Sequence, residues 1–336
     1  MNPVWIDQAG VLPIPADRDP LGLDTEFMRR NTFHPKLALA QAAHGGACWL
    51  IDPSAYDAGA DVRALVAERV CVMHSAGEDL EALAPLLGDT PLQLFDTQIA
   101  AAMCGMGPGI SYQKLVAAML GLDIPKDETR SDWLQRPLTA GQIDYAAQDV
   151  AHLAELHERL SGELQRRERG AWLAEDCTRL VERAQRNQKE TDQQPQRGFP
   201  GAAEWPVQTQ ARLKRVLIWR DESARKLDRP RPWVLDDAHA LALSQQPPAN
   251  GGELFERVKG QRALRGQQRA ELLAQLQATA TPEELTALAP IPASPKGEAR
   301  RAVDAMREVV QVVAATLDLP AGLLCPRRLI EEFAVT

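Results

Sequence analysis

An acidic pair interrupts the most apolar stretch near the start of the chain. Asp24 and Glu26 lie within the run LGLDTEF at residues 21–27, which otherwise predicts a core β-strand. Side chains two residues apart in a strand point to the same face, so both carboxylates face one direction. Burying an unpaired carboxylate is costly, and residues 21–28 contain no Lys or Arg. A bound divalent metal would resolve this conflict, whereas such a pair taken alone is more often the wet face of an edge strand.

The next predicted helix carries a third acid. A strand at residues 70–74 precedes it, and Ser75 and Glu78 have the spacing of a capping box, which predicts that the helix begins there. Asp79 then shares a helix face with Leu83, so a carboxylate lies on an otherwise apolar stripe. A favourable interaction with the helix dipole is the simpler explanation of this acid when it is considered alone.

A fourth acid repeats the anomaly in a helix predicted over residues 139–160. Asp149 precedes Leu153 on one helix face, and Tyr145, one turn earlier, places its phenol beside the Asp149 carboxylate. A core tyrosine and an aspartate bonded to a backbone amide would explain this helix without a metal. All four acids have a common explanation in two-metal phosphoryl chemistry, which needs three or four converging carboxylates and a group that orients water.

The composition predicts a soluble globular protein of two or three domains. The 336 residues are 45% hydrophobic and 25% charged, with no apolar leader and no run of about 18 apolar residues, so we expect a cytoplasmic protein. Five scattered cysteines without C-x-x-C spacing favour neither disulfides nor a zinc site.

The charge is distributed unevenly along the chain. The net charge is −8, yet residues 1–160 hold 11 basic and 22 acidic side chains, whereas residues 212–269 hold 13 basic and 7 acidic side chains. A basic module can therefore contact nucleic-acid phosphates.

The order of predicted elements indicates an α/β domain with a mixed sheet, followed by an all-α region. A turn at residues 44–46 joins two antiparallel strands, and strand–helix units follow. A segment at 185–200 rich in Gln, Asn, Arg and Pro predicts a linker, after which every predicted element is a helix. The predicted strands cover 21–28, 37–43, 47–51, 70–74 and 92–95, and the predicted helices cover 62–68, 78–87, 112–120, 139–160, 163–186, 211–227, 236–243, 253–258, 266–277, 282–288, 299–317 and 327–333.

These motifs resemble those of a known family, the DEDD exonucleases. Asp24-x-Glu26, the stretch from His74 to Asp79, and Tyr145-x-x-x-Asp149 are similar to its three motifs in the tyrosine subclass. Asp144 stands where the histidine subclass would have its histidine. Within the family, the stretches YQKL at 112–115 and SDWLQRPLT at 131–139 closely resemble ribonuclease D.

The resemblance extends past the linker and implies a domain organisation. The stretches LIWRDESAR at 217–225 and RPRPWV at 229–234 are similar to the HRDC domain, a small helical nucleic-acid-binding module. The resemblance implies a 3′-5′ exonuclease domain of ribonuclease H-like fold at residues 1–185, a linker at 186–206, an HRDC domain at 207–285, and room for a second, diverged HRDC-like domain at 286–336.

The resemblance also implies an activity and its site. The enzyme would hydrolyse RNA from the 3′ end to nucleoside 5′-monophosphates, with tRNA precursors and other small structured RNAs as substrates and no obligatory protein partner. Two divalent ions, Mg²⁺ or Mn²⁺, would be its cofactors. Asp24, Glu26 and Asp149 would bind the water-activating ion, Asp24 would bridge to the second ion, and Asp79 would hold that second ion. Tyr145 would position the attacking water.

Substrate contacts are expected around these acids. Phe27 and Met28 follow Glu26 and would line the pocket for the 3′-terminal nucleotide, whereas the alternation of the strand turns Thr25 and Phe27 away from the acids. Trp219 and Trp233 could stack on bases but fit the core of a small helical domain better. The remaining predicted substrate contacts are His74, Lys114, Arg130 and Trp133, and Lys126 and Arg136 are further candidates for phosphate contacts. A structural role would explain His74 more simply. Each of the Lys and Arg side chains could equally be an ordinary surface charge.

One alternative function stays open from sequence alone. A nucleic-acid-binding protein with an inert nuclease fold would use only its helical modules, although four intact acids and Tyr145 argue for the enzyme. An aspartic protease would need Gly where Glu26 stands. The residue types do not decide between RNA and DNA, because contacts to a 2′-hydroxyl have no sequence signature here.

Overall fold

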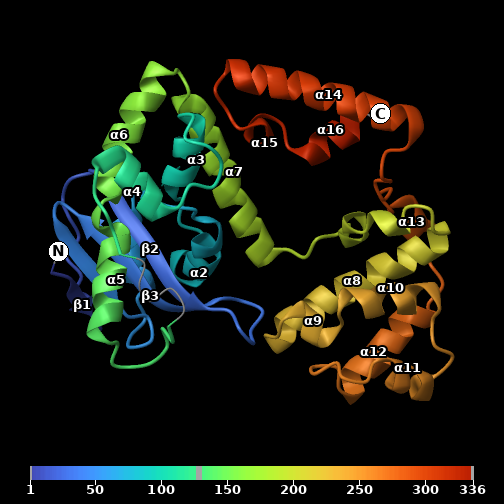
Figure 1. Cartoon of the computed structure of the whole chain (residues 1–336). Coiled ribbons are helices and arrows are strands. Elements are labelled where there is room, and N and C mark those ends of the chain that lie inside the picture. The colour runs from blue at the N-terminus through green and yellow to red at the C-terminus, as the bar shows by residue number, and fades with distance from the viewer. Residues whose placement is uncertain (1, 126–130, 334–336) are drawn as a thin grey trace. The chain divides into compact units, whose positions relative to one another are not determined.

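The computed structural model describes residues 2–125 and 131–333, and the chain divides into two compact units (Figure 1). Within the described residues, the first unit comprises 2–28, 35–188 and 304–330, and the second comprises 29–34, 189–303 and 331–333. The first unit contains every strand, and the second is helical. This observation confirms the predicted fold class.

A mixed six-stranded sheet forms the centre of the first unit. β3 is antiparallel to both of its neighbours, and all other neighbouring strands are parallel. All five strands predicted from the sequence are present, each within one residue of its predicted bounds, whereas β1 is too short to show an alternating pattern and was missed. The strands follow the order β1 (Val4–Ile6), β4 (Ala47–Ile51), β3 (Lys36–His44), β2 (Leu21–Met28), β5 (Val70–Met73) and β6 (Gln93–Asp96).

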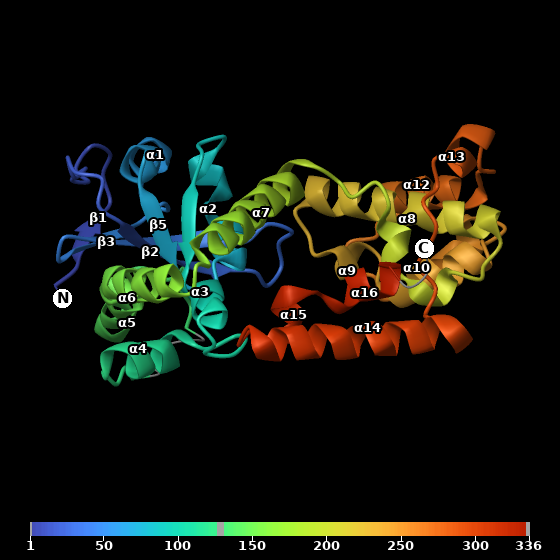
Figure 2. The ribbon, with the colours of Figure 1, turned by 90° about the horizontal axis from the view of Figure 1, so that it is seen from above.

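Helices cover both faces of this sheet, as Figure 2 shows. Alternation along β2 sends Leu21 and Leu23 into the core under α1 and α2, and sends Asp24 and Glu26 to the face under α5. One face carries α1 (Gly59–Val66) and α2 (Gly77–Leu87), and the other carries α3 (Thr97–Met103), α4 (Tyr112–Leu120), α5 (Ala140–Ala151) and α6 (Leu153–Arg166). The first unit also contains α7 (Gly170–Lys189) up to residue 188, and α15 (Ala321–Leu324).

Two of the predicted helices are divided in the structure. The helix predicted over 139–160 is divided into α5 and α6 at His152, and the helix predicted over 163–186 is divided between α6 and α7. The predicted capping box at Ser75 and Glu78 is wrong, because Ser75 has a φ of 62° and α2 begins after Ala76 without a side-chain cap.

Asp96 supplies one of the two hydrogen bonds that the capping box was expected to make, the one to the Ser75 N–H. Its carboxylate accepts the N–H groups of Ser75 and Ala76 before α2, at 3.2 and 2.9 Å. It also caps α3 by accepting those of Gln98 and Ile99, at 2.8 and 3.2 Å. One buried acid at the end of β6 therefore caps α3 and holds the turn that precedes α2. Helix α3 was missed from the sequence, although an Asp at a strand end is a helix-start signal.

An ion pair fixes the segment that carries Trp133. Arg136 donates to both carboxylate oxygens of Asp52, at 2.6 and 2.7 Å, and to the carbonyl oxygens of Ala38 and Trp133, at 2.7 and 2.9 Å. Burial would raise the pKa of Asp52, but the hydrogen bonds from Arg136 and from its own turn hold that pKa below its usual value. Arg136, expected as a phosphate contact, is therefore a structural residue.

The second unit packs its helices around one apolar core. Trp219 is 7% exposed within this core, and its Nε1 donates to Glu271 at 3.2 Å, so the core role expected for Trp219 is confirmed. The helices that lie wholly in this unit are α8 (Val207–Leu227), α9 (Arg231–Val234), α10 (Asp237–Gln245), α11 (Gly251–Arg257), α12 (Gly266–Gln277) and α13 (Pro282–Thr286), with short 3₁₀ helices at Pro195–Gly198 and Pro200–Ala202, while α14 (Gly297–Thr316) and α16 (Arg327–Phe333) contribute residues to both units.

A loop that follows the acidic strand belongs to the second unit. Residues 29–34 join β2 to β3, and Phe33 is 7% exposed in the helical core. The guanidinium groups of Arg225 and Arg231 lie 4.8 and 4.6 Å from the centre of its ring. The Asp228 carboxylate accepts the Phe33 N–H at 2.9 Å. These contacts anchor the loop in the second unit.

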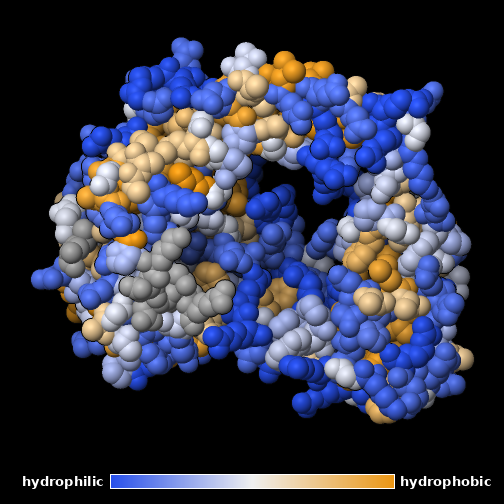
Figure 3. All heavy atoms as spheres, viewed as in Figure 1, coloured by the Kyte–Doolittle hydropathy of each residue, from blue (hydrophilic) through white to orange (hydrophobic). Residues whose placement is uncertain are grey.

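The visible surface is mainly hydrophilic, with hydrophobic residues gathered where Figure 1 labels α14 (Figure 3). On that helix Val309 and Val312 are 63% and 66% exposed. Within residues 2–125 and 131–333, no helix combines the length and the apolar character that a membrane crossing would require.

The Asp52–Arg136 pair leads to a stability prediction. Asp52→Ala leaves the Arg136 guanidinium partly buried without its anion, and we expect the free energy of unfolding of the first unit to fall by about 3 kcal/mol. Urea denaturation followed by circular dichroism measures this change. Glu155→Ala, which removes the exposed pair with Arg159, is the control and should cost less than about 0.5 kcal/mol. Equal losses in the two variants would contradict a structural role for Arg136.

Candidate active site

Strand β2 and helix α5 bring the predicted acids together because the helix approaches the strand closely. A Cβ atom at Gly22 would lie 3.2 Å from the Leu153 Cβ atom and 3.2 Å from the Val150 carbonyl oxygen. Gly22 lies on the same face of β2 as Asp24, two residues away. The absence of a side chain at Gly22 therefore lets the end of α5, with Asp149, pack against the acidic part of the strand.

Three of the four predicted acids form one cluster. Asp24, Glu26 and Asp149 each place a carboxylate oxygen within 4.8 Å of the others, and all three side chains are half-buried. Two come from neighbouring positions of one strand face, and the third comes from a helix more than 120 residues later in the chain. The convergence that the sequence predicted for these three is confirmed.

Asp79 reaches the same region from the opposite face of the sheet. It lies in the first turn of α2, it is 9% exposed, and its carboxylate accepts a hydrogen bond from the Thr25 hydroxyl. The expectation that Thr25 points away from all the acids is therefore wrong, because the face of β2 opposite Asp24 is the face that meets Asp79. Asp79 still lies near enough to raise the pKa of Asp24 and Glu26 by charge repulsion.

The electrostatics of the cluster are dominated by burial and like charge. Desolvation, and then repulsion from Asp149 and Asp79, raises the pKa of Glu26 to about 9. The same two causes hold the pKa of Asp24 well above its usual value. Burial raises the pKa of Asp79 to about 6 and that of Asp149 to about 7. In the absence of a cation, the folded protein therefore binds protons at this site near neutral pH.

Tyr145 is placed beside the cluster by its position one turn before Asp149. Its hydroxyl donates a hydrogen bond to the Asp149 carboxylate, which partly offsets the effect of burial on the pKa of that acid. Burial and the nearby acids raise the pKa of the Tyr145 phenol, so it stays protonated and remains a donor. The ring lies 6.0 Å from that of Trp133, centre to centre.

The donor set matches a divalent cation that prefers oxygen ligands. Asp24, Glu26 and Asp149 offer three carboxylate oxygens within one small space, and Asp79 offers a fourth acid beside them. Among the described residues, none of the leading influences on the pKa of Asp24 and Glu26 is a Lys or Arg side chain. Mg²⁺ and Mn²⁺ favour such ligands, and a bound cation would remove the repulsion described above.

The predicted substrate contacts occupy different environments. Phe27 and Met28 are half-buried at the end of β2, Lys114 is exposed on α4, and Trp133 is 3% exposed in the core. Arg130 and Lys126 lie outside the described residues. A role in binding substrate stays a prediction for each of these residues.

His74 holds a loop in place. Its Nε2 donates to the Ile110 carbonyl oxygen at 3.0 Å, and its Nδ1 lies 2.9 Å from the Thr97 hydroxyl. Burial lowers the pKa of His74, so the ring is neutral at neutral pH. Both ring nitrogens are engaged by the protein, and a substrate contact through His74 stays a prediction.

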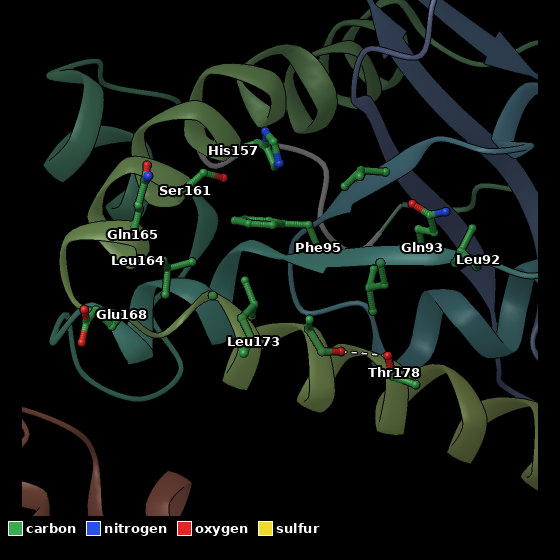
Figure 4. A pocket seen from close by; sticks show the side chains of 15 residues that line it. Leu92, Gln93, Phe95, His157, Ser161, Leu164, Gln165, Glu168, Leu173 and Thr178 are labelled. Atoms are coloured by element: carbon green, nitrogen blue, oxygen red, sulfur yellow. Dashed lines mark hydrogen bonds between the residues drawn. The ribbon is translucent and has the colours of Figure 1, made fainter.

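A separate cavity of about 740 Å³ lies beside the edge strand β6, between α6 and α7 (Figure 4). Phe95 projects into this space and meets His157 edge-to-face, with ring centres 4.5 Å apart. None of the four acids or Tyr145 lines it. The cavity is therefore distinct from the acidic cluster.

Comparison with known proteins decides the family. A model described as a 3′-5′ exonuclease matches residues 11–165, and a model of the HRDC domain matches residues 209–276. Ribonuclease D of Xanthomonas oryzae pv. oryzae is 39% identical over 317 residues, which cover 93% of this chain and 85% of that protein. The chain belongs to the ribonuclease D family. The resemblance stated from the sequence motifs is thereby confirmed.

Other members of the ribonuclease D family support the assignment. Ribonuclease D of Pseudomonas paraeruginosa is 38% identical over 324 residues, covering 93% of this chain and 82% of that protein. The crystal structure of Escherichia coli RNase D superposes with a TM-score of 0.85 and 27% identity, covering 99% of this chain and 90% of that one. That protein is described as an exoribonuclease involved in structured RNA processing.

The raised pKa values lead to a prediction about pH. Protonated carboxylates are favoured in the folded, metal-free protein, so their stabilising contribution is complete at low pH and is lost as pH rises towards about 9. We expect the melting temperature in EDTA to fall between pH 5 and pH 9, and Glu26→Gln to make that fall shallower. Differential scanning calorimetry measures both.

The control for this prediction is the exposed acid Glu155 on α6. Glu155→Gln should leave the pH dependence as it is in the unsubstituted protein. Adding Mn²⁺ should raise the melting temperature most at high pH, where the ligands ionise most readily. A metal-free melting temperature that rises from pH 5 to pH 9 would contradict the burial of these acids in one site.

Proposed function

We propose that this chain is a metal-dependent 3′→5′ exoribonuclease that hydrolyses RNA to nucleoside 5′-monophosphates by a two-metal-ion mechanism. Its substrates are proposed to be tRNA precursors and other small structured RNAs that need 3′ maturation in the cytoplasm. The observation that carries the proposal is the cluster of Asp24, Glu26 and Asp149, with Asp79 and Tyr145 beside it. Membership of the ribonuclease D family and the exonuclease match at residues 11–165 support it.

Each residue has a role that follows from its place. Asp24, Glu26 and Asp149 would hold one divalent cation, and Asp24 with Asp79 would hold another. Such a pair of cations supplies an activated water and stabilises the leaving oxygen. Tyr145, fixed by its hydrogen bond to Asp149, would orient the attacking water at the 3′-terminal phosphodiester. Thr25, bonded to Asp79, would keep that acid turned towards the site.

The HRDC region is proposed to hold the RNA, and one surface of it has suitable chemistry. Residues 257–270 contain five basic and no acidic side chains. The Phe255 ring is 46% exposed and lies 5.9 Å from the Lys259 ammonium and 5.1 Å from the Arg269 guanidinium. The Arg262 guanidinium lies 5.1 Å from the half-buried Trp233 ring. Cations beside aromatic rings suit single-stranded RNA, which offers phosphates and stacking bases.

The domain limits follow the same proposal. The exonuclease domain is proposed to span residues 1–185 and the HRDC domain 207–285, joined by a linker at 186–206. Residues 286–336 are proposed as a second, diverged HRDC-like module, of which residues 304–330 group with the first unit.

Loss of a ligand should abolish the activity. With a 3′-labelled RNA and Mg²⁺, Asp24→Asn should lower kcat by about 10³-fold or more, because ligands of one site act as a unit. Tyr145→Phe should lower kcat by about 10²-fold and retain metal binding. Tyr56→Phe removes a hydroxyl that bonds Asp61 and is the matched control. Full activity of Asp24→Asn would refute the proposed site. No mononucleotide release by the unsubstituted protein would refute the proposed activity and favour an inert adaptor.

The basic surface at residues 257–270 should affect the binding of long RNA substrates and not that of short ones. Arg262→Ala combined with Arg265→Ala should raise KM for a 20-nucleotide RNA. The slope of log KM against the logarithm of the salt concentration should fall by about one for each phosphate that the protein no longer neutralises. Hydrolysis of a dinucleotide should be unchanged, because the exonuclease site is untouched. Arg159→Ala, an exposed arginine on α6, is the control. Equal effects on both substrates would argue against RNA binding at this surface.

A further inference from the structure

A buried glutamine lies directly across from Asp24 in the sheet. Gln41 of β3 is the register partner of Asp24 of β2 in the antiparallel pair, and it is 0% exposed. Directly opposed residues of antiparallel strands point to the same face, with Cβ atoms about 5 Å apart. The Gln41 side chain is therefore the nearest cross-strand neighbour of a proposed metal ligand.

The packing around β3 shows which face this is. Leu39 and Ala43, two residues before and after Gln41, belong to the core that also contains Val150 of α5. Leu39 is opposite Glu26, and Ala43 is opposite Gly22, the residue against which α5 packs. Gln41 thus points under α5, on the side of the sheet where the carboxylates cluster.

The amide of Gln41 has no protein partner among the described residues. Neither its Oε1 nor its Nε2 makes a hydrogen bond. Three other buried glutamines, Gln142, Gln196 and Gln210, each use at least one amide atom in a hydrogen bond. Leaving a buried polar group unpaired costs about 1–3 kcal/mol, and an apolar side chain of the same length would avoid that cost. A structural role alone therefore gives no reason for an amide at this position.

We propose that Gln41 is a positioning residue for Asp24. Its amide nitrogen holds the Asp24 carboxylate through one enclosed water, in the orientation in which that carboxylate binds divalent cations. The inference rests on the proposed function, because it gives Asp24 the role of metal ligand. A carboxylate that binds a cation through one lone pair keeps others free for such a donor, and donors of this kind commonly tune metal affinity about 10- to 100-fold.

The test compares two methionine substitutions in the full-length protein. Gln41→Met keeps the length of the side chain and removes the amide. Leu50→Met is the control, because Leu50 is opposite Gln41 on β4, on the same face and 1% exposed, but one strand further from the acids. Isothermal titration of Mn²⁺ into the EDTA-stripped proteins gives the affinity, and calorimetry in EDTA gives the melting temperature.

We expect Gln41→Met to weaken Mn²⁺ binding by about 10- to 100-fold while its metal-free melting temperature stays the same or rises. The kcat on RNA should fall and KM should not change, because the substituted group touches no substrate. Leu50→Met should leave Mn²⁺ affinity unchanged. Unchanged affinity in Gln41→Met, or an equal loss in Leu50→Met, would overturn the proposal.

A second variant keeps the test decisive if Gln41→Met does not fold. Gln41→Leu also removes the amide, and we expect it to weaken Mn²⁺ binding by about 10- to 100-fold. Wild-type affinity in Gln41→Leu together with wild-type kcat would also overturn the inference. A failure of the proposed function is a different result, because the unsubstituted protein would then neither bind Mn²⁺ at Asp24 nor release mononucleotides.

Discussion

Repulsion among Asp24, Glu26 and Asp149 is the interaction on which the rest of the first unit depends. Three half-buried carboxylates with oxygens within 4.8 Å of one another oppose folding, so the surrounding structure must supply the stability. The close packing of α5 on Gly22 does so in part, and the capping box of Thr139 and Gln142 fixes the start of that helix. A bound cation would turn this unfavourable contribution to the free energy of folding into a favourable one. Folding of the site and metal binding are therefore coupled.

Local patterns in the sequence predicted much of this arrangement. Alternation in residues 21–28 placed Asp24 and Glu26 on one face, and the spacing of Tyr145 and Asp149 placed the phenol beside the carboxylate. Both relations are set within a single element, so two or four residues suffice to reveal them. Predicting that Asp149 lies beside Asp24 and Glu26 required more than one local pattern, because three separate motifs had to be interpreted together.

Contacts between distant residues could not be predicted in the same way. Thr25 bonds Asp79 across 54 residues, and Arg136 bonds Asp52 across 84. A threonine between two acids, or an arginine before a proline, has no local signal for such a partner. Asp96 replaced the expected cap for a similar reason, since its carboxylate arrives from the end of another strand. The fold class was predicted because it follows from the order of elements, whereas the partners of buried polar groups follow from the tertiary structure.

The loop at residues 29–34 has a consequence for dividing the protein. Phe33 completes the helical core, yet it follows the acidic strand directly in the chain. Cutting the polypeptide once, between residues 188 and 189, would separate Phe33 from the two arginines that contact its ring. The nuclease half would then expose a bare aromatic ring, and the helical half would contain a hole in its interior. Neither half keeps all of its contacts, so shuffling these domains during evolution would require repair at Phe33 and at residues 304–330, which belong to the first unit but follow the cut.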